Sequence, residues 1–259
     1  MTGAVTTPHP LATQAGMAVL EAGGTAPEAL IAAGAVLAVV MPHFCGLGGD
    51  AVWLIADRHG DARSLLAIGQ GIDRPLPAGP IPTRGPGAVL TTAAVVDGWQ
   101  QALNHARDHL GGRCRWDDLL APAQRLAQDG FAVTQSQDFW TRHRRAEVAD
   151  WPGFAPIFLP DGGPAAAGSL LRQPDLAASL AALREHGAQD FYCGALSHRI
   201  VEGLRAAGAV IAAGDLRRTR TRQAAPLSLP YRGLTLLAPP PPTQGVTTLQ
   251  IMGILSHLD

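Results

Sequence analysis

The feature that most constrains the fold is an apolar segment, residues 29–41, in which no charged residue occurs. Thr25 precedes it as a candidate N-cap, and Glu28 stands three residues later, at the spacing of a capping box. Pro42 cannot continue a helix and marks its end. A helix that is apolar on nearly all sides is typical of a protein interior. The sequence therefore predicts a central, buried helix.

The rest of the chain is predicted to form further helices and a few strands. Helices are predicted over residues 13–22 from a Thr13 cap, 97–110, 116–128, 138–147, 175–186, 195–207 and 248–258. Strands are predicted over 51–56, 64–68 and, as a pair, within 227–237. A short link is expected at 189–192, a helical cap after Gly214, and a Pro- and Gly-rich loop wrapped over the core at 69–87. Residues 1–259 are interpreted as one domain.

Composition excludes several classes of protein. A hydrophobic fraction of 47% with 16% charged residues is typical of a globular protein with a sizeable core. A net charge of −1 without a long basic run argues against nucleic acid as a partner. The apolar segment is shorter than the about 20 residues of a membrane-spanning helix, and no signal peptide is recognised, so we expect a cytoplasmic protein without a membrane partner. Three cysteines without metal-like spacing predict neither a metal nor a cofactor.

A series of short motifs runs through the chain in a fixed order. The first block contains Thr7-Pro8-His9-Pro10, Gly23-Gly24 and Gly46-Leu47-Gly48-Gly49-Asp50. Later come Val96-Asp97-Gly98-Trp99, Leu119-Leu120-Ala121-Pro122-Ala123, Gly130-Phe131, Leu171-Arg172-Gln173-Pro174-Asp175, Tyr231-Arg232-Gly233 and Pro241-Pro242-Thr243-Gln244-Gly245. In this order, the motifs resemble the large chain of the γ-glutamyltranspeptidase family of N-terminal-nucleophile amide hydrolases.

The resemblance implies an α+β fold, the four-layer αββα sandwich of N-terminal-nucleophile hydrolases, to which this chain supplies mostly helices and some strands. It also implies a zymogen that cleaves itself and frees a threonine, whose hydroxyl attacks an amide carbonyl with its own amine as base. The family's threonine opens a small chain, and none within residues 1–259 fits that role. We therefore expect a small catalytic chain as partner, in a heterodimer made from one precursor, and an inactive isolated chain.

Two residues are candidates for substrate binding. In transpeptidases of the family, an arginine after the second strand binds the α-carboxylate of the γ-glutamyl group, because its guanidinium matches a carboxylate. Our alignment places Gln70 in that position. A neutral amide holds a carboxylate less strongly, and Arg74, four residues on, is the candidate to compensate. An exposed loop arginine without a binding role is the alternative for Arg74.

The motifs around Asp50 and Thr243 are more similar to the acylase and oxamate amidohydrolase branch, which hydrolyses small-molecule amides. The prediction is therefore an amide hydrolase of that branch. Two alternatives remain: a true γ-glutamyltransferase or glutathione hydrolase, and a truncated, non-catalytic fragment that only binds a partner chain.

Other chemically suggestive residues favour structural roles. The glycines of residues 46–49 follow a helix and precede a strand, the reverse of a dinucleotide-binding loop. His9 and His43 stand beside prolines, where a packed, hydrogen-bonded histidine is expected, and Cys45 is interpreted as buried and inert. The threonine pairs at 91–92 and 247–248 are internal and are also interpreted as structural.

Overall fold

The computed structural model describes residues 3–75 and 79–258 of the chain. Its helices are α1 (Pro10–Glu21), α2 (Ala26–Val40), α3 (Val95–His109), α4 (Trp116–Asp129), α5 (Gln135–Val148), α6 (Ala155–Phe158), α7 (Pro174–His186), α8 (Asp190–Cys193), α9 (Ala195–Ala206), α10 (Ala213–Arg218) and α11 (Gly245–Leu255), with 3-10 turns η1 (Pro86–Ala88) and η2 (Pro160–Gly162). Its strands are β1 (Ala51–Ala56), β2 (Ala62–Ala67), β3 (Phe131–Ala132), β4 (Leu170–Leu171), β5 (Arg222–Ala224), β6 (Leu227–Tyr231) and β7 (Leu234–Ala238).

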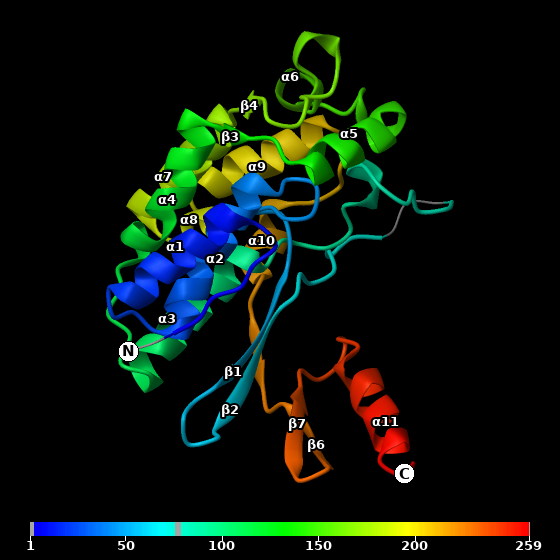
Figure 1. Ribbon diagram of the computed structural model, residues 1–259. Helices are drawn as coiled ribbons and strands as arrows, with labels where there is room; N and C mark the ends of the chain where they lie inside the picture. Colours follow the sequence, from blue (N-terminus) through cyan, green and yellow to red (C-terminus); the bar gives the residue numbers. More distant parts are fainter. Residues whose placement is uncertain (1–2, 76–78, 259) are drawn as a thin grey trace.

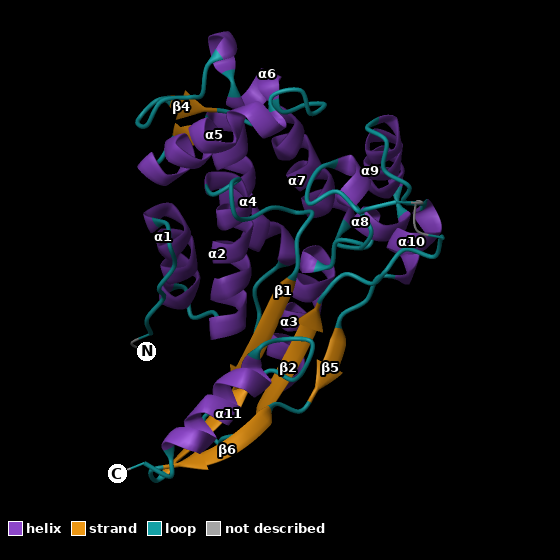
Figure 2. Cartoon of the chain, turned by 90° about the vertical axis from the view of Figure 1, so that its right-hand side faces the viewer, coloured by secondary structure: helices purple, strands orange, loops and turns teal. Residues whose placement is uncertain are grey.

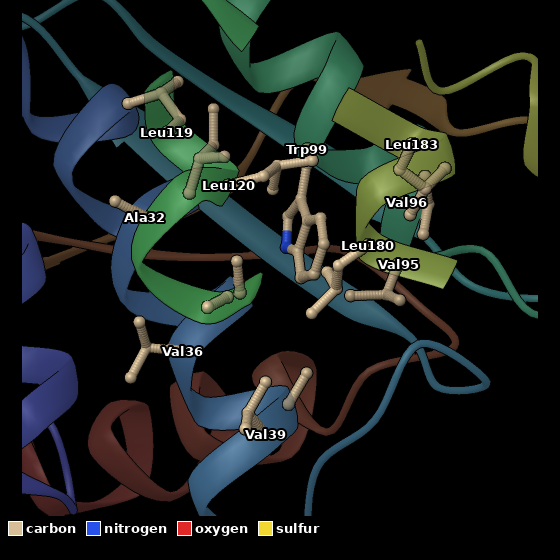
Figure 3. Packing of buried hydrophobic residues seen from close by; sticks show 14 of the residues in the cluster. Ala32, Val36, Val39, Val95, Val96, Trp99, Leu119, Leu120, Leu180 and Leu183 are labelled. Atoms are coloured by element: carbon tan, nitrogen blue, oxygen red, sulfur yellow. The ribbon is translucent and has the colours of Figure 1, made fainter. Parts of the chain in front are cut away.

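The predicted buried helix, α2, lies within the helical body and packs against α1, α3 and α4 (Figure 1). Side chains of α2, α3, α4 and α7 converge around Trp99, whose side chain is almost completely buried (Figure 3). Apolar burial of this kind contributes about 25 cal/mol for each Å² removed from water. The helical core is therefore the main source of stability in this part of the chain.

A capping box fixes the start of α2, as the sequence predicts. The backbone N–H and the hydroxyl of Thr25 both donate to one carboxylate oxygen of Glu28, at 2.7 and 2.8 Å. The backbone N–H of Cys114 donates to the other oxygen at 2.7 Å. Glu28 is fully buried. Its carboxylate thus joins the first turn of α2 to the segment that leads into α4.

The main sheet has the strand order β1-β2-β5, with antiparallel pairs (Figure 2). Ala51 pairs with Ala67, and Ser64 pairs with Ala224. Alternate side chains of β1 face opposite sides: Trp53 is buried, whereas Leu54 is 41% exposed. Helix α3 packs against β1 and β2. Among the described residues, one face of this sheet is therefore covered by helix while apolar side chains of β1 lie open on the other.

The C-terminal part of the chain forms a separate layer. β6 and β7 pair as a hairpin, and α11 packs against both strands. Figures 1 and 2 show these elements at one end of the molecule, opposite α5 and α6. Ile254 of α11 is 67% exposed, and none of the residues of α11 is buried. The described chain thus presents a second open apolar surface at this end.

The predicted elements are present, with corrections at four places. α5 begins at Gln135 rather than at residue 138, because the hydroxyl of Thr134 accepts the backbone N–H of Gln137 and caps the helix. α1 begins at Pro10 rather than after Thr13, because Nδ1 of His9 accepts the backbone N–H of Leu11 and caps the helix. The short link at 189–192 is the one-turn helix α8, and α11 begins at Gly245 rather than at Thr248. The loop predicted over 69–87 includes residues 76–78, which lie outside the described residues. No helix in the described ranges has the length and apolar character needed to cross a membrane.

Candidate functional site

The candidate site lies where the chain leaves β2. Asp50, the last residue of the glycine-rich motif, accepts the backbone N–H of Gly69 through its carboxylate at 2.9 Å. The carbonyl of Gly49 accepts the backbone N–H groups of Ala94 and Val95, which begin α3. The motif therefore joins the end of β2 to the start of α3, and its role is structural, as the sequence predicts.

The loop after β2 runs tightly against residues 91–92. A Cβ atom at Gly69 would lie 1.7 Å from the carbonyl oxygen of Thr92, so this approach requires glycine. Backbone and hydroxyl groups of Thr92 bind Gln70: Thr92 N–H donates to the Gln70 carbonyl at 2.9 Å, and Gln70 N–H donates to the Thr92 hydroxyl at 3.2 Å. Thr92 is buried, which supports its structural interpretation.

The side-chain amide of Gln70 is occupied by backbone groups. Its Nε2 donates to the carbonyls of Ile68 and Arg220, at 2.7 and 3.1 Å, and its Oε1 accepts the N–H of Arg220 at 2.9 Å. Arg220 stands just before β5, which pairs with β2. The side-chain amide of Gln70 therefore extends the hydrogen-bond pattern between β2 and β5 beyond the ends of the two strands.

Thr221, the residue that follows Arg220, is bound by a side chain of α3. The backbone N–H of Thr221 donates to a carboxylate oxygen of Asp97 at 2.6 Å, and the backbone N–H of Asp97 donates to the hydroxyl of Tyr192 at 2.8 Å. Burial raises the pKa of Tyr192, and the charges of Asp97 and Asp50 raise it further against the opposing effect of that hydrogen bond. Tyr192 therefore stays protonated, and its hydroxyl accepts the backbone N–H of Asp97 from a buried, fixed position.

A second contact between the loop after β2 and the segment before β5 is centred on Asp215. Its carboxylate, 3% exposed, accepts the N–H groups of Asp73 and Ala212 at 2.9 and 2.8 Å and an Arg218 nitrogen at 2.6 Å. Burial raises the pKa of Asp215, but these hydrogen bonds and the charges of Arg218 and Arg74 outweigh it and lower the pKa overall. Residues 69–74 therefore run beside residues 215–221 and are fixed to them at both ends.

The two sequence-predicted site residues have different surroundings. Gln70 is half-buried and committed to Arg220. Arg74 is exposed, and its charge acts on Asp215. In the part of the chain that the structure describes, the side chains of Arg74, Arg220 and Arg222 have no ion pair, and all three are exposed. Their exposed guanidinium groups are therefore available to bind an anionic group.

Sequence reasoning missed Arg220, Asp97 and Asp215 as members of this site. Arg220 is 150 residues from Gln70 along the chain. The only local signal was the sequence of arginines at 217, 218, 220 and 222, which is unusually dense for this chain. Asp97 belonged to a recognised motif but carried no indication of its partner.

Two of the remaining candidates, His9 and Cys45, have surroundings that favour structural roles. His9 is buried and caps α1, and burial lowers its pKa, so it is neutral near pH 7. Cys45 is half-buried rather than buried, and burial raises the pKa of its thiol, which disfavours the nucleophilic thiolate. The described residues contain no cluster of three side chains able to hold a metal ion.

Known proteins are similar to this chain over nearly its whole length. The model of a family described as gamma-glutamyltranspeptidase matches residues 12–259. The oxamate amidohydrolase proenzyme of Klebsiella pneumoniae is 41% identical over 261 residues, which cover 99% of this chain and 49% of that protein. The glutathione hydrolase-like YwrD proenzyme of Bacillus subtilis is 37% identical over 98% of this chain and 49% of its own length.

The fold is also that of a solved relative. The crystal structure of Helicobacter pylori gamma-glutamyltranspeptidase superimposes with a TM-score of 0.90 at 25% identity, over 100% of this chain and 76% of that one. The α+β, N-terminal-nucleophile hydrolase fold expected from the sequence is thereby confirmed. The chain spans about half the length of the curated relatives above. On the family model, these relatives and this fold together, the chain belongs to the γ-glutamyltranspeptidase family.

Proposed function

We propose that the complete protein hydrolyses a small amide that carries a carboxylate next to the scissile bond, as oxamate does. The nucleophile is the threonine that opens a second chain cut from the same precursor. The relative named oxamate amidohydrolase proenzyme supports this reading, because it matches almost the whole of this chain and is about twice as long. We infer the threonine mechanism from the family resemblance, and we assign substrate binding to the site around Gln70 in this chain.

The observation that carries the proposal is the position of Gln70. Our alignment places Gln70 where transpeptidases of the family have an arginine, and its side-chain amide binds both the backbone carbonyl and the backbone N–H of Arg220. Gln70 is therefore a positioning residue, and a guanidinium must come from elsewhere if a carboxylate is to be bound. Arg220 is fixed directly beside it with an exposed side chain, and Arg74 is the second candidate. We propose Arg220 as the main carboxylate anchor.

In the reaction, the threonine hydroxyl attacks the amide carbonyl and gives its proton to the threonine amine. The C–N bond then breaks, ammonia leaves with that proton, and an ester to the threonine remains. Water hydrolyses the ester and releases the dicarboxylate. The arginines of this chain hold the neighbouring carboxylate and keep the carbonyl in line with the hydroxyl.

The open apolar surfaces support a second chain as partner. Leu54 of β1 and Ile254 of α11 are exposed in the described chain, although both are large and apolar. Exposed apolar patches of this kind mark interfaces. A second sheet packed on β1 and β2 would complete the four-layer sandwich and would bring the threonine to the edge that holds Gln70.

The test begins with the protein expressed from its complete gene. The denatured intact mass should show two chains, the smaller beginning with threonine. Ammonia release is then measured with oxamate, and p-nitroaniline release with γ-glutamyl-p-nitroanilide, which separates the amidohydrolase from the transpeptidase alternative. We expect turnover of oxamate and little turnover of the γ-glutamyl substrate. A single uncut species without either activity would support the non-catalytic fragment instead.

Variants then test the anchor. Loss of a charge-assisted pair of about 1.5–3 kcal/mol should raise KM for oxamate about tenfold or more in Arg220→Gln. Arg74→Gln should have a smaller effect. Arg58→Gln, an exposed change in the turn between β1 and β2, is the matched control and should leave KM unchanged. An unchanged KM in Arg220→Gln would rule out Arg220 as the anchor.

A further inference from the structure

A pocket remains that takes no part in the site around Gln70. It has a volume of about 340 Å³ and lies among α5, α6, the residues after α2 and Arg84. These helices lie at the end of the molecule opposite β6, β7 and α11 (Figures 1 and 2). Pockets for small molecules commonly measure about 300–1,000 Å³, so this one suits a molecule of one or two rings.

The walls of the pocket are aromatic. Phe44 meets Trp140 edge to face with 5.8 Å between the ring centres, and His43 lies 4.7 Å from Phe44. Phe154 and Phe158 of the α6 segment pack at 5.0 Å, and Trp151 completes the lining. Phe44 is 63% exposed. Such rings offer both faces and edges to a planar ligand.

Two buried polar atoms at the pocket lack a partner among the described residues. Oε1 of Gln137, whose side chain is 2% exposed, accepts no hydrogen bond. Nδ1 of His43 also has none, although its Nε2 lies 3.1 Å from the hydroxyl of Ser136. Both residues line the pocket. Buried polar atoms are nearly always paired, so these two indicate a polar group that the described chain does not itself supply.

The rim of the pocket is positively charged. Arg84 and Arg144 each bind a different carboxylate oxygen of Glu147, at 2.9 and 3.0 Å. Two guanidinium groups face one carboxylate, which leaves one positive charge in excess. Arg144 also lies over the ring of Trp140, 5.8 Å from its centre. The charge therefore stands directly above an aromatic wall.

We propose that this pocket binds a planar aromatic carboxylic acid of one or two rings. The ring system lies among Phe44, Trp140 and Trp151, and the carboxylate meets Arg144 and Arg84 at the rim. A ring N–H or hydroxyl on the ligand donates to Oε1 of Gln137. This pocket shares no lining residue with the site around Gln70, so neither proposal depends on the other.

The probe is indole-3-acetate, which combines a two-ring system, an N–H donor and a carboxylate. Its binding to the protein expressed from its complete gene is measured by isothermal titration calorimetry, beside indole and acetate. We expect indole-3-acetate to bind at least tenfold more tightly than either fragment. Equal affinity for indole and indole-3-acetate would overturn the role of the rim, and no binding of any probe would overturn the site.

Matched variants locate the binding. Trp140→Leu and Arg144→Gln, which change the wall and the rim, should each weaken binding at least fivefold. Arg142→Gln on the same helix and Leu170→Ala on β4, two exposed residues that do not line the pocket, should leave the affinity unchanged. Circular dichroism spectra confirm that each variant is folded. Weakening by the control pair to the same extent as by the pocket pair would contradict the proposed location.

Discussion

The side chain of Gln70 forms hydrogen bonds to both backbone groups of Arg220, a residue 150 positions later in the chain, at 3.1 and 2.9 Å. This pair joins the loop that leaves β2 to the segment that enters β5. It fixes Arg220, whose side chain is exposed, beside the residue that our alignment placed at the position of an arginine in transpeptidases of the family.

Replacing Gln70 by leucine removes both hydrogen bonds to Arg220. It also removes the bond to the carbonyl of Ile68, so three bonds are lost. Because the site is half-buried, each lost bond should cost about 0.5–1.5 kcal/mol, so the free energy of unfolding should fall by about 1.5–4.5 kcal/mol. Hydrogen exchange at the Arg220 amide should accelerate locally. Gln100→Leu is the control, since the Gln100 side chain reaches only Asn104 of its own helix. Unchanged exchange at Arg220 would mean that the amide does not hold this segment.

Alanine at Gly69 should destabilise the protein strongly, whereas alanine at Gly71 should have little effect. A Cβ at Gly69 would meet the backbone of Thr92, whereas a Cβ at Gly71 would meet nothing within 4 Å. Gly69→Ala should therefore lower the free energy of unfolding by about 3 kcal/mol or more, because backbone on both sides must move. Gly71→Ala should remain within about 0.5 kcal/mol of the wild type. Denaturant titration of both variants distinguishes this from a general intolerance of the loop, which would destabilise both equally.

The buried carboxylate of Glu28 should make stability depend on pH. Burial raises the pKa of Glu28, but the hydrogen bonds from Thr25 and Cys114 outweigh it, and the pKa lies below its ordinary value of 4.5. A carboxylate with a lowered folded pKa stabilises the fold above the unfolded pKa, and this contribution is lost as the pH falls through the folded pKa.

Glu28→Gln should therefore cost about 1.5–3 kcal/mol at pH 7. It should also flatten the decline of stability below a pH of about 4.5. Thermal unfolding between pH 3 and 7 measures both effects, with Glu21→Gln at the exposed end of α1 as the control. A variant that parallels the wild type throughout this range would show that another carboxylate governs the decline.

The three cysteines should react with iodoacetamide in a definite order. Cys193 is exposed, whereas Cys45 and Cys114 are half-buried. Burial raises the pKa of Cys45, and burial together with the nearby charge of Glu28 raises the pKa of Cys114 to about 11. At pH 8, alkylation followed by peptide mass spectrometry should therefore label Cys193 first and Cys114 last. Faster labelling of Cys45 than of Cys193 would indicate an activated thiol and would revive Cys45 as a nucleophile.

Local sequence determined most of the secondary structure. The apolar segment before Pro42, with Thr25 and Glu28 at its start, predicted α2 within one residue, because capping and helical periodicity act over a few residues. The start of α1 was placed wrongly at Thr13. A histidine is an uncommon cap, and only its packed position lets Nδ1 of His9 accept the N–H of Leu11.

The order of motifs also determined the family, and with it the expected fold. It also made Gln70 a candidate, because our alignment places this neutral residue where the transpeptidase motif has an arginine. Sequence alone could not assign the role of that side chain. Its partner, Arg220, lies just before β5, and strand pairing between distant segments leaves no mark in either segment by itself.

Tertiary structure alone decided the composition of both proposed sites. Packing of α3 against the sheet brings Asp97 to Thr221, and the antiparallel pairing of β2 with β5 brings Arg220 to Gln70. The aromatic pocket likewise joins residues near 43, 84, 140 and 154 that are spread over more than a hundred positions. The sequence determined which helices form and what they bury, since those preferences are local. Which polar side chains meet was set by long-range packing, since that depends on the whole core.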